Sequence, residues 1–134
     1  MVAYVDTSAL LKRYVLEADS ALAERLLGDD PVLVSSWVTA VEVRRNLARL
    51  LGEGTLATVR RRAERDLDRI ALVTCDGSVA TLACEIAEQF GVRSLDAVHM
   101  ASAKRLMIDD LSFITFDLRQ AETARRLGMR VLGC

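Results

Sequence analysis

Short apolar runs alternate with helical patterns along the chain, and this alternation limits what the chain can fold into. The runs are rich in β-branched residues, which is typical of buried strands; they lie at 2–5, 32–34, 70–73, 112–115 and 130–132. Parallel strands need crossover connections, and these are usually helices. The sequence therefore predicts an α/β fold with a mostly parallel sheet of about five short strands flanked by about seven helices.

Residues that begin and end helices set the expected boundaries. A first helix is expected at about 8–15, and a second begins at Asp19 or Ser20 and ends at Gly28, before a turn at 29–31. Ser94 occupies the position of an N-cap for a helix that runs to about 106. The other helices are expected at 38–51, 55–69, 79–90 and 118–127.

Length and composition fit one globular domain over residues 1–134, of which 51% are hydrophobic. No signal-peptide pattern and no apolar run of roughly 20 residues occurs, so we expect a cytoplasmic protein without a membrane partner. The net charge of -1 shows no basic excess, and any contact with phosphate must be local. Cys75, Cys84 and Cys134 lack the spacing of disulfide or zinc sites, so reduced thiols are expected.

Four acidic residues lie where an open α/β sheet binds its ligands. Asp6 and Asp117 follow predicted strands, whereas Glu42 and Asp96 lie near the starts of helices. Because like charges raise each other's pKa, such a group needs a counter-charge. The chain has few lysines and its arginines are concentrated in the middle helices, so a hard divalent cation, Mg²⁺ or Mn²⁺, is the expected partner.

A divalent cation held by carboxylates activates bound water for phosphodiester hydrolysis and needs no histidine base. Thr7, Ser8 and Thr115 lie beside the acids and are expected to orient metal-bound water or a phosphate, although each also suits a cap or turn. His99 follows Asp96 by three residues. We expect it to be packed or to support a ligand, because Mg²⁺ prefers oxygen.

Four segments resemble the acidic motifs of the PIN domain family, and more narrowly its short members of the VapC toxin type. The segments are VDTSALLKRY at 5–14, VTAVEVRR at 38–45, SLDAVHMASA at 94–103 and FITFD at 113–117. They match the family in order and spacing over the whole chain. Singly, Glu42 suits a solvated helix position, Asp96 a first helical turn and Asp117 an N-cap, but their joint order favours a site.

The resemblance implies a single PIN domain in which Asp6, Glu42, Asp96 and Asp117 are catalytic metal ligands and Thr115 is the polar residue before the last acid. It implies an Mg²⁺- or Mn²⁺-dependent endoribonuclease that forms a homodimer and is restrained by a small VapB-like antitoxin. A toxin of a VapBC pair is the expected function. The alternatives are a housekeeping RNA-processing nuclease and a non-catalytic PIN-like module that binds RNA or protein.

Basic residues divide into two groups. Arg45 and Arg49 follow Glu42 closely and are the candidates for contacting the RNA backbone. The denser run at 60–69 is interleaved with acids, which is typical of a solvated helix face with pairs such as Arg62 with Asp66.

Other phosphoryl-transfer enzymes fit the sequence less well. A haloacid-type phosphatase needs D-x-D where this chain has Asp6-Thr7-Ser8, and a receiver domain needs paired acids after its first strand and a late lysine. A phosphate loop of the G-x-x-x-x-G-K type is absent from the sequence. The adjacent acids Asp109 and Asp110 precede a predicted strand and are expected to form a turn.

Overall fold

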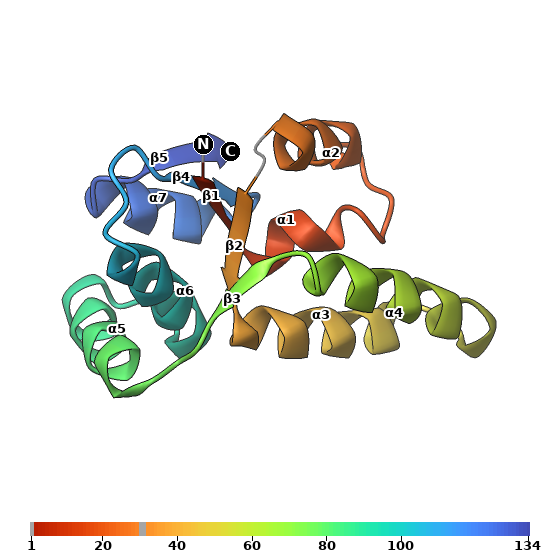
Figure 1. Ribbon diagram of the computed structural model, residues 1–134, viewed down its shortest axis with the longest axis horizontal. Helices are drawn as coiled ribbons and strands as arrows, with labels where there is room; N and C mark the ends of the chain where they lie inside the picture. Colours follow the sequence, from red (N-terminus) through yellow and green to blue (C-terminus); the bar gives the residue numbers. More distant parts are fainter. Residues whose placement is uncertain (1, 30–31) are drawn as a thin grey trace.

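A sheet of five parallel strands forms the centre of the computed structural model, which describes residues 2–29 and 32–134 (Figure 1). The strands are β1 (Val2–Val5), β2 (Val32–Ser36), β3 (Ala71–Val73), β4 (Ser112–Thr115) and β5 (Arg130–Gly133), in the spatial order β3-β2-β1-β4-β5. β1 is the central strand and pairs with β2 and β4. The predicted α/β class and parallel sheet are confirmed.

Helices connect the strands and cover both faces of the sheet. They are α1 (Thr7–Leu11), α2 (Ser20–Asp29), α3 (Trp37–Leu50), α4 (Glu53–Leu67), α5 (Gly77–Phe90), α6 (Ser94–Arg105) and α7 (Leu118–Arg126). Figure 1 shows α5, α6 and α7 gathered at one side of the molecule, and α1 to α4 at the other. Each helical group covers one face of the sheet, as its buried contacts show.

Side chains that alternate along the strands build two separate cores. Tyr4 of β1 and Phe113 of β4 pack into the cluster formed with α5, α6 and α7. Ala3, Val5 and Ile114 point the other way and pack against α1, α3 and α4. All five side chains are fully buried. Burial on both faces explains why these strands are continuous apolar runs in the sequence.

Two helix ends in the first part of the chain differ from those expected. α1 ends at Leu11, because the amides of Arg13 and Tyr14 each bond to the carbonyl three residues earlier and tighten the chain into turns. α2 continues to Asp29, so Gly28 lies inside this helix and does not end it. Residues 30 and 31 of the expected turn lie outside the described residues.

The predicted N-cap of α6 is also wrong. Ser94 is already the first helical residue, and Arg93 occupies the cap position without a side-chain hydrogen bond to the helix. The Arg93 side chain instead turns toward Asp96, one turn into the helix. A capping serine was expected because serine favours that position, but here an ion pair spans the first turn.

The expected pair of Arg62 with Asp66 is not formed. Arg62 Nη2 lies 3.8 Å from Glu24 Oε1, on α2. Asp66 accepts a hydrogen bond of 2.7 Å from the Tyr14 hydroxyl and lies 3.6 Å from Arg13 Nη1. Partners from the α1 to α2 region therefore replace the i,i+4 neighbour, because they approach Asp66 from the packed side of α4.

The remaining composition-based expectations concern thiols and membranes. Cys75 and Cys84 are exposed, Cys134 is half-buried, and all three are free thiols, as expected. Among the described residues, no helix has both the length and the apolar character needed to cross a membrane.

Candidate active site

Four acidic residues lie at the edge of the sheet where the parallel strands end. Asp6 directly follows β1, and Asp117 lies just beyond β4 at the start of α7. Glu42 lies early in α3, the helix that begins directly after β2, and Asp96 lies in the first turn of α6. Their expected position at the carboxyl edge of the sheet is confirmed.

Asp6 is completely buried and is held by three donors. Its Oδ1 accepts hydrogen bonds from Ser8 Oγ at 2.7 Å and from the Ala9 amide at 3.0 Å, and its Oδ2 accepts one from Thr115 Oγ1 at 2.6 Å. Burial raises the pKa of Asp6, and the bonds from Thr115 and Ser8 offset only part of that rise. A buried carboxyl of this kind favours a nearby cation.

Thr115 connects the first acid to the last. Its hydroxyl donates to Asp6 and accepts a hydrogen bond of 3.0 Å from the backbone amide of Asp117. Asp117 caps α7, and its Oδ1 accepts bonds from the amides of Arg119 and Gln120 at 2.9 and 3.2 Å. Capping fixes the orientation of this carboxylate and leaves Oδ2 outside the cap, 3.9 Å from Arg93 Nη2. The Asp117 side chain is thus both the N-cap of α7 and a candidate metal ligand.

Glu42 is held by a hydroxyl and by the one histidine of the chain. Its Oε1 accepts bonds of 2.8 Å from both Thr7 Oγ1 and His99 Nε2. Partial burial alone raises the pKa of Glu42, but the hydrogen bond and charge of His99, together with Thr7, outweigh it and hold that pKa below its ordinary value. Glu42 is therefore kept ionised by its neighbours.

His99 is fully buried, as expected for a packed or supporting residue. A carboxylate accepts but does not donate, so His99 Nε2 carries a proton toward Glu42. Its Nδ1 lies 2.9 Å from the hydroxyl of Tyr4, and burial raises the pKa of that phenol, which keeps it protonated. Tyr4 thus orients the imidazole that orients Glu42, a contact that was not predicted from the sequence.

Asp96 is buried between an arginine and a glutamine. Gln120 Nε2 donates to Asp96 Oδ1 at 2.9 Å, and Arg93 Nε donates to Asp96 Oδ2 at 3.1 Å. Neither partner was predicted from the sequence. Arg93 stands three residues before Asp96 and Gln120 three residues after Asp117, so helical spacing from each acid was the available signal.

Arg93 is a positive charge beside the acids that was not predicted from the sequence. Its guanidinium bonds to Asp96, and its Nη2 lies 3.9 Å from Asp117 Oδ2. The hydrogen bond and charge of Asp96, followed by the charges of Asp117 and Glu42, raise the pKa of Arg93. The arginine comes from the loop before α6 and not from the middle helices, which is why its position was not foreseen.

The donor atoms of this edge fit a hard divalent cation. Every candidate ligand atom is a carboxylate or hydroxyl oxygen, the type that Mg²⁺ and Mn²⁺ prefer. In the part of the chain that the structure describes, no three Asp, Glu, His or Cys side chains converge as they would around a metal. Arg93 supplies the positive charge in this conformation, and its side chain is 68% exposed and so is able to leave.

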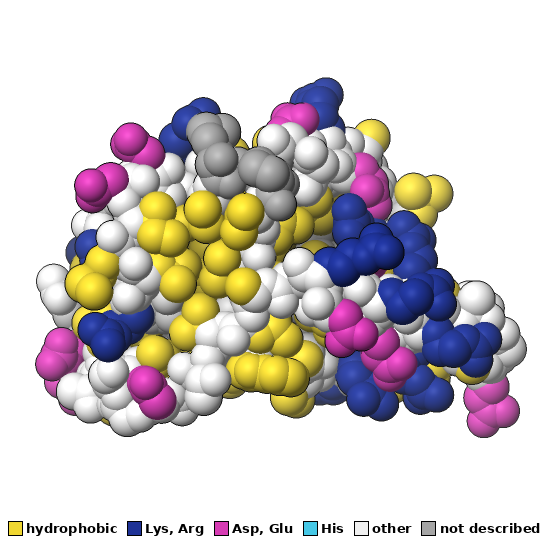
Figure 2. All heavy atoms as spheres, in the orientation of Figure 1, with side chains coloured by type: hydrophobic (Ala, Val, Ile, Leu, Met, Phe, Trp, Pro, Cys, Tyr) yellow, Lys and Arg dark blue, Asp and Glu magenta, His cyan; other side chains and the backbone are white. Residues whose placement is uncertain are grey.

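The arginines expected to contact RNA do not contact the acids. Arg45 and Arg49 are exposed on α3, and Arg49 Nη2 bonds to Asn46 Oδ1 at 3.2 Å. Figure 2 shows Lys and Arg side chains gathered over the α3 and α4 end of the molecule, with Asp and Glu side chains among them. Their contact with RNA stays a prediction.

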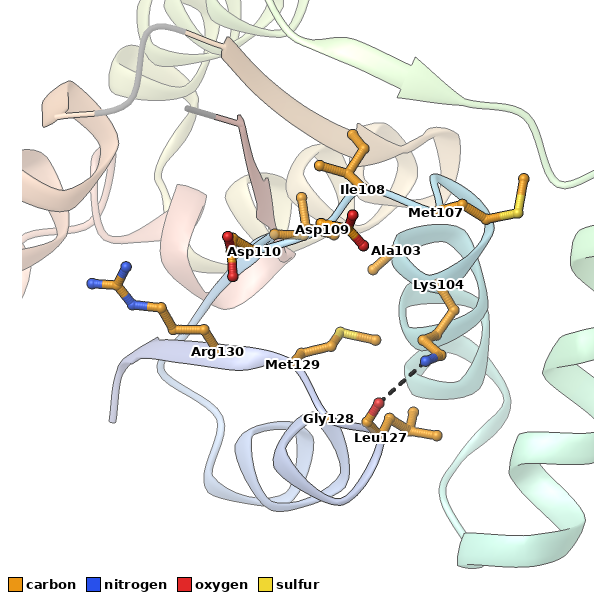
Figure 3. A pocket seen from close by; sticks show the side chains of 11 residues that line it. Ala103, Lys104, Met107, Ile108, Asp109, Asp110, Leu127, Gly128, Met129 and Arg130 are labelled. Atoms are coloured by element: carbon orange, nitrogen blue, oxygen red, sulfur yellow. Dashed lines mark hydrogen bonds between the residues drawn. The ribbon is translucent and has the colours of Figure 1, made fainter.

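Two cavities flank the sheet at opposite edges. A cavity of about 530 Å³ lies at the amino ends of β4 and β5, where Asp109 and Asp110 form the expected turn (Figure 3). Its lysine, Lys104, already donates to the Leu127 carbonyl at 3.2 Å. The larger volume is thus remote from the four acids, whereas a cavity of about 190 Å³ includes Asp96 in its wall.

Comparison with known proteins gives the family of the chain. A family model described as PIN domain matches residues 3–126, a range that includes all four acids. Ribonuclease VapC46 of Mycobacterium tuberculosis is 36% identical over 129 residues, which are 96% of this chain and 95% of that protein.

Solved structures share the fold at lower sequence identity. VapC20 of Mycobacterium tuberculosis, described as a sarcin-ricin loop cleaving toxin, has a TM-score of 0.74 at 20% identity, over 91% of this chain and 94% of that one. A toxin-antitoxin complex from Klebsiella pneumoniae contains a chain with a TM-score of 0.69 at 18% identity, over 86% of each chain. With a family model that spans most of its length and a relative above 30% identity, this chain belongs to the PIN domain family.

Proposed function

We propose that this chain is a divalent-metal-dependent endoribonuclease and the toxin of a toxin–antitoxin pair. One observation carries the proposal: a fully buried Asp6 at the carboxyl edge of the sheet is linked through Thr115 to Asp117, the last of the four acids. The chain's 36% identity to a named ribonuclease supports RNA as the substrate class. Retention of all four acids favours an enzyme over a non-catalytic module.

Asp6, Glu42, Asp96 and Asp117 are the residues that would hold Mg²⁺ or Mn²⁺. When bound, such a cation activates water as a nucleophile and neutralises charge on the phosphoryl group and leaving oxygen. The chain's own part is to hold these carboxylates in fixed orientations, so that they need no rearrangement when charge develops.

Hydroxyl groups and the imidazole of His99 supply that orientation. Ser8 and Thr115 fix the two oxygens of Asp6, and Thr7 and His99 fix Oε1 of Glu42. None of these residues is assigned the role of general base, because a bound cation would supply the activated water. His99 is therefore assigned a supporting role.

The proposed partners follow from the same relatives. The Klebsiella pneumoniae neighbour is a toxin-antitoxin complex, which supports a small VapB-like antitoxin as the partner of this chain. We also propose a homodimer. Trp37 and Val41, one turn apart on α3, are 56% and 70% exposed, and apolar side chains this exposed suit an interface. Light scattering of the purified chain checks the dimer, and a monomer at micromolar concentration would contradict it.

The experiment that tests the activity compares Asp6→Asn with the wild type on total cellular RNA. Wild type is expected to cleave with Mg²⁺ or Mn²⁺ and to stop in EDTA. Asp6→Asn is expected to lose more than the roughly 10–100-fold that removal of an outer-sphere partner costs. Asp109→Asn, an exposed acid at the opposite edge, is the matched control and should cleave as wild type does. Equal activity of wild type and Asp6→Asn, or no cleavage by wild type, excludes the proposed function.

A further inference from the structure

A cavity of about 190 Å³ opens directly beside Asp96, between α7 and the connection from α5 to α6. Its charged lining consists of Arg93, Arg119 and Arg126 with Asp96 and Glu122. The volume is below the roughly 300–1,000 Å³ of pockets that enclose drug-sized ligands. The cavity therefore suits one charged group of a larger molecule better than a whole small-molecule ligand.

Two of its arginines come from one face of α7. Arg119 and Arg126 are seven residues apart, two helical turns, and Glu122 lies between them. Neither arginine has an acidic partner within 4.0 Å among residues 2–29 and 32–134, and both are exposed. Their hydrogen-bond donors are thus available to an anion from outside the chain.

The Phe90 ring holds the second of these arginines in place. The guanidinium carbon of Arg126 lies 4.7 Å from the centroid of Phe90. A guanidinium stacked on a ring keeps its planar edge free, and little side-chain entropy remains to be lost when that edge meets a phosphate. Arg93 completes the positive side of the cavity where it borders Asp96.

Charge in the cavity favours an anion. Its lining carries three arginines against two acids, Asp96 and Glu122, and so has a net positive charge. Arginine recognises phosphate through paired hydrogen bonds, and phosphate contacts position a nucleic acid without reading its sequence.

We propose that this cavity binds a backbone phosphate of the RNA strand that neighbours the phosphate to be cut. The inference rests on the proposed function and names a subsite for its substrate. The cavity opens beside Asp96, so a strand with its scissile phosphate at the four acids would reach the cavity by continuing past Asp96. The strand would therefore follow α7, and not only the α3 surface that carries Arg45 and Arg49.

Binding to an RNA that is not cut tests the subsite. The probe is a fluorescein-labelled, mixed-sequence RNA of 12 nucleotides, and Kd is measured by anisotropy over a series of salt concentrations in the Asp6→Asn background. Arg119→Gln/Arg126→Gln is expected to raise Kd about tenfold. It should also reduce the steepness of the plot of log K against log salt, by about 0.7 for each phosphate that the protein no longer neutralises. Arg119→Gln alone preserves the Arg126–Phe90 stacking, and it keeps the test valid if the double variant does not fold.

The matched control is Arg105→Gln/Arg130→Gln in the same background. It removes the same charge from exposed positions at the opposite edge of the sheet and should leave Kd within about twofold. An unchanged Kd and salt slope in the cavity variant overturns the subsite, as does an equal weakening in the control. Cleavage by the wild type is measured separately. Its absence excludes the proposed function, whereas intact cleavage with unchanged RNA binding excludes only the subsite.

Discussion

Arg93 bonds through its Nε to Asp96 Oδ2 at 3.1 Å, so a residue of the chain itself supplies the counter-charge of a carboxylate that would hold a cation. The same guanidinium reaches to 3.9 Å from Asp117. The arginine and a divalent cation are thus alternative counter-charges for the same two acids. Because the arginine is 68% exposed, the ion pair is screened by solvent and costs little to break.

Removing Arg93 should tighten cation binding. Arg93→Gln eliminates the competing positive charge, and the Kd of the purified chain for Mn²⁺ is expected to fall about threefold to tenfold when measured by isothermal titration calorimetry. The melting temperature in EDTA should change little, since the pair is exposed. Arg105→Gln, at the far end of α6, removes an equal charge as the control. Weaker Mn²⁺ binding in Arg93→Gln, but not in the control, contradicts this competition.

Asp6→Asn should stabilise the metal-free chain. Burial raises the pKa of Asp6, so the folded state binds its proton more tightly than the unfolded state does. The contribution of Asp6 to stability is then greatest below its ordinary pKa and is lost as the pH rises through the folded value. In EDTA near neutral pH, the variant is expected to melt about 3 °C above wild type. This difference in melting temperature should disappear as the pH is lowered.

Addition of Mn²⁺ supplies the opposite arm of that experiment. The cation should raise the melting temperature of wild type and not that of Asp6→Asn, because binding to the folded state alone stabilises it. Differential scanning fluorimetry from pH 4 to pH 8 measures the melting temperatures of wild type and of Asp6→Asn, each with and without Mn²⁺. If Asp6→Asn melts below wild type in EDTA at every pH, the buried carboxyl is not a source of instability.

The sequence predicted those parts of the site that depend on one segment of chain. Asp6 and Asp117 were placed at the carboxyl edge because each lies just past an apolar strand, and strand direction decides where such residues emerge. The contacts made by Arg93, Gln120 and Tyr4 were not predicted. Those of Gln120 and Tyr4 join elements far apart in the sequence, and only the packing of α6 against α7 and β1 brings them together.

Local preference and tertiary contact also compete in the fold. The strands were found almost to the residue, because both faces of the sheet bury apolar side chains. Helix ends were less predictable. Glycine commonly ends helices, yet α2 includes Gly28 and continues to Asp29. Arg62 lies near Glu24, whereas its expected partner, Asp66, accepts a hydrogen bond from Tyr14. A helical pattern in the sequence does not show that tertiary partners replace the neighbour one turn away.

His99→Gln should weaken the enzyme without abolishing it. Glutamine retains a donor for Glu42 but not the rigid ring that Tyr4 fixes through Nδ1. Cleavage of cellular RNA is expected to fall about 10–100-fold, with a matching decrease in Mn²⁺ affinity. Tyr4→Phe keeps the ring packing and removes only the hydroxyl, so its effect should be smaller. Complete loss of cleavage in a folded His99→Gln variant would falsify the supporting role and indicate direct chemistry.

Gly133→Ala should destabilise the chain and damage the site together. Gly133 has a φ of 111° and pairs with Thr115, and a Cβ at this position would lie 2.2 Å from the Thr115 carbonyl oxygen. The strand pair must open, at a cost of at least about 2 kcal/mol in the free energy of unfolding. Thr115 also holds Asp6, so displacement of β4 should lower cleavage as well.

The control is Gly54→Ala on α4, where the added Cβ meets no atom within 4 Å, and it is expected to stabilise the chain by up to about 1 kcal/mol. Urea denaturation and the cleavage assay on both variants check the link. A destabilised Gly133→Ala that cleaves as wild type does would show that β5 supports the fold without positioning Asp6.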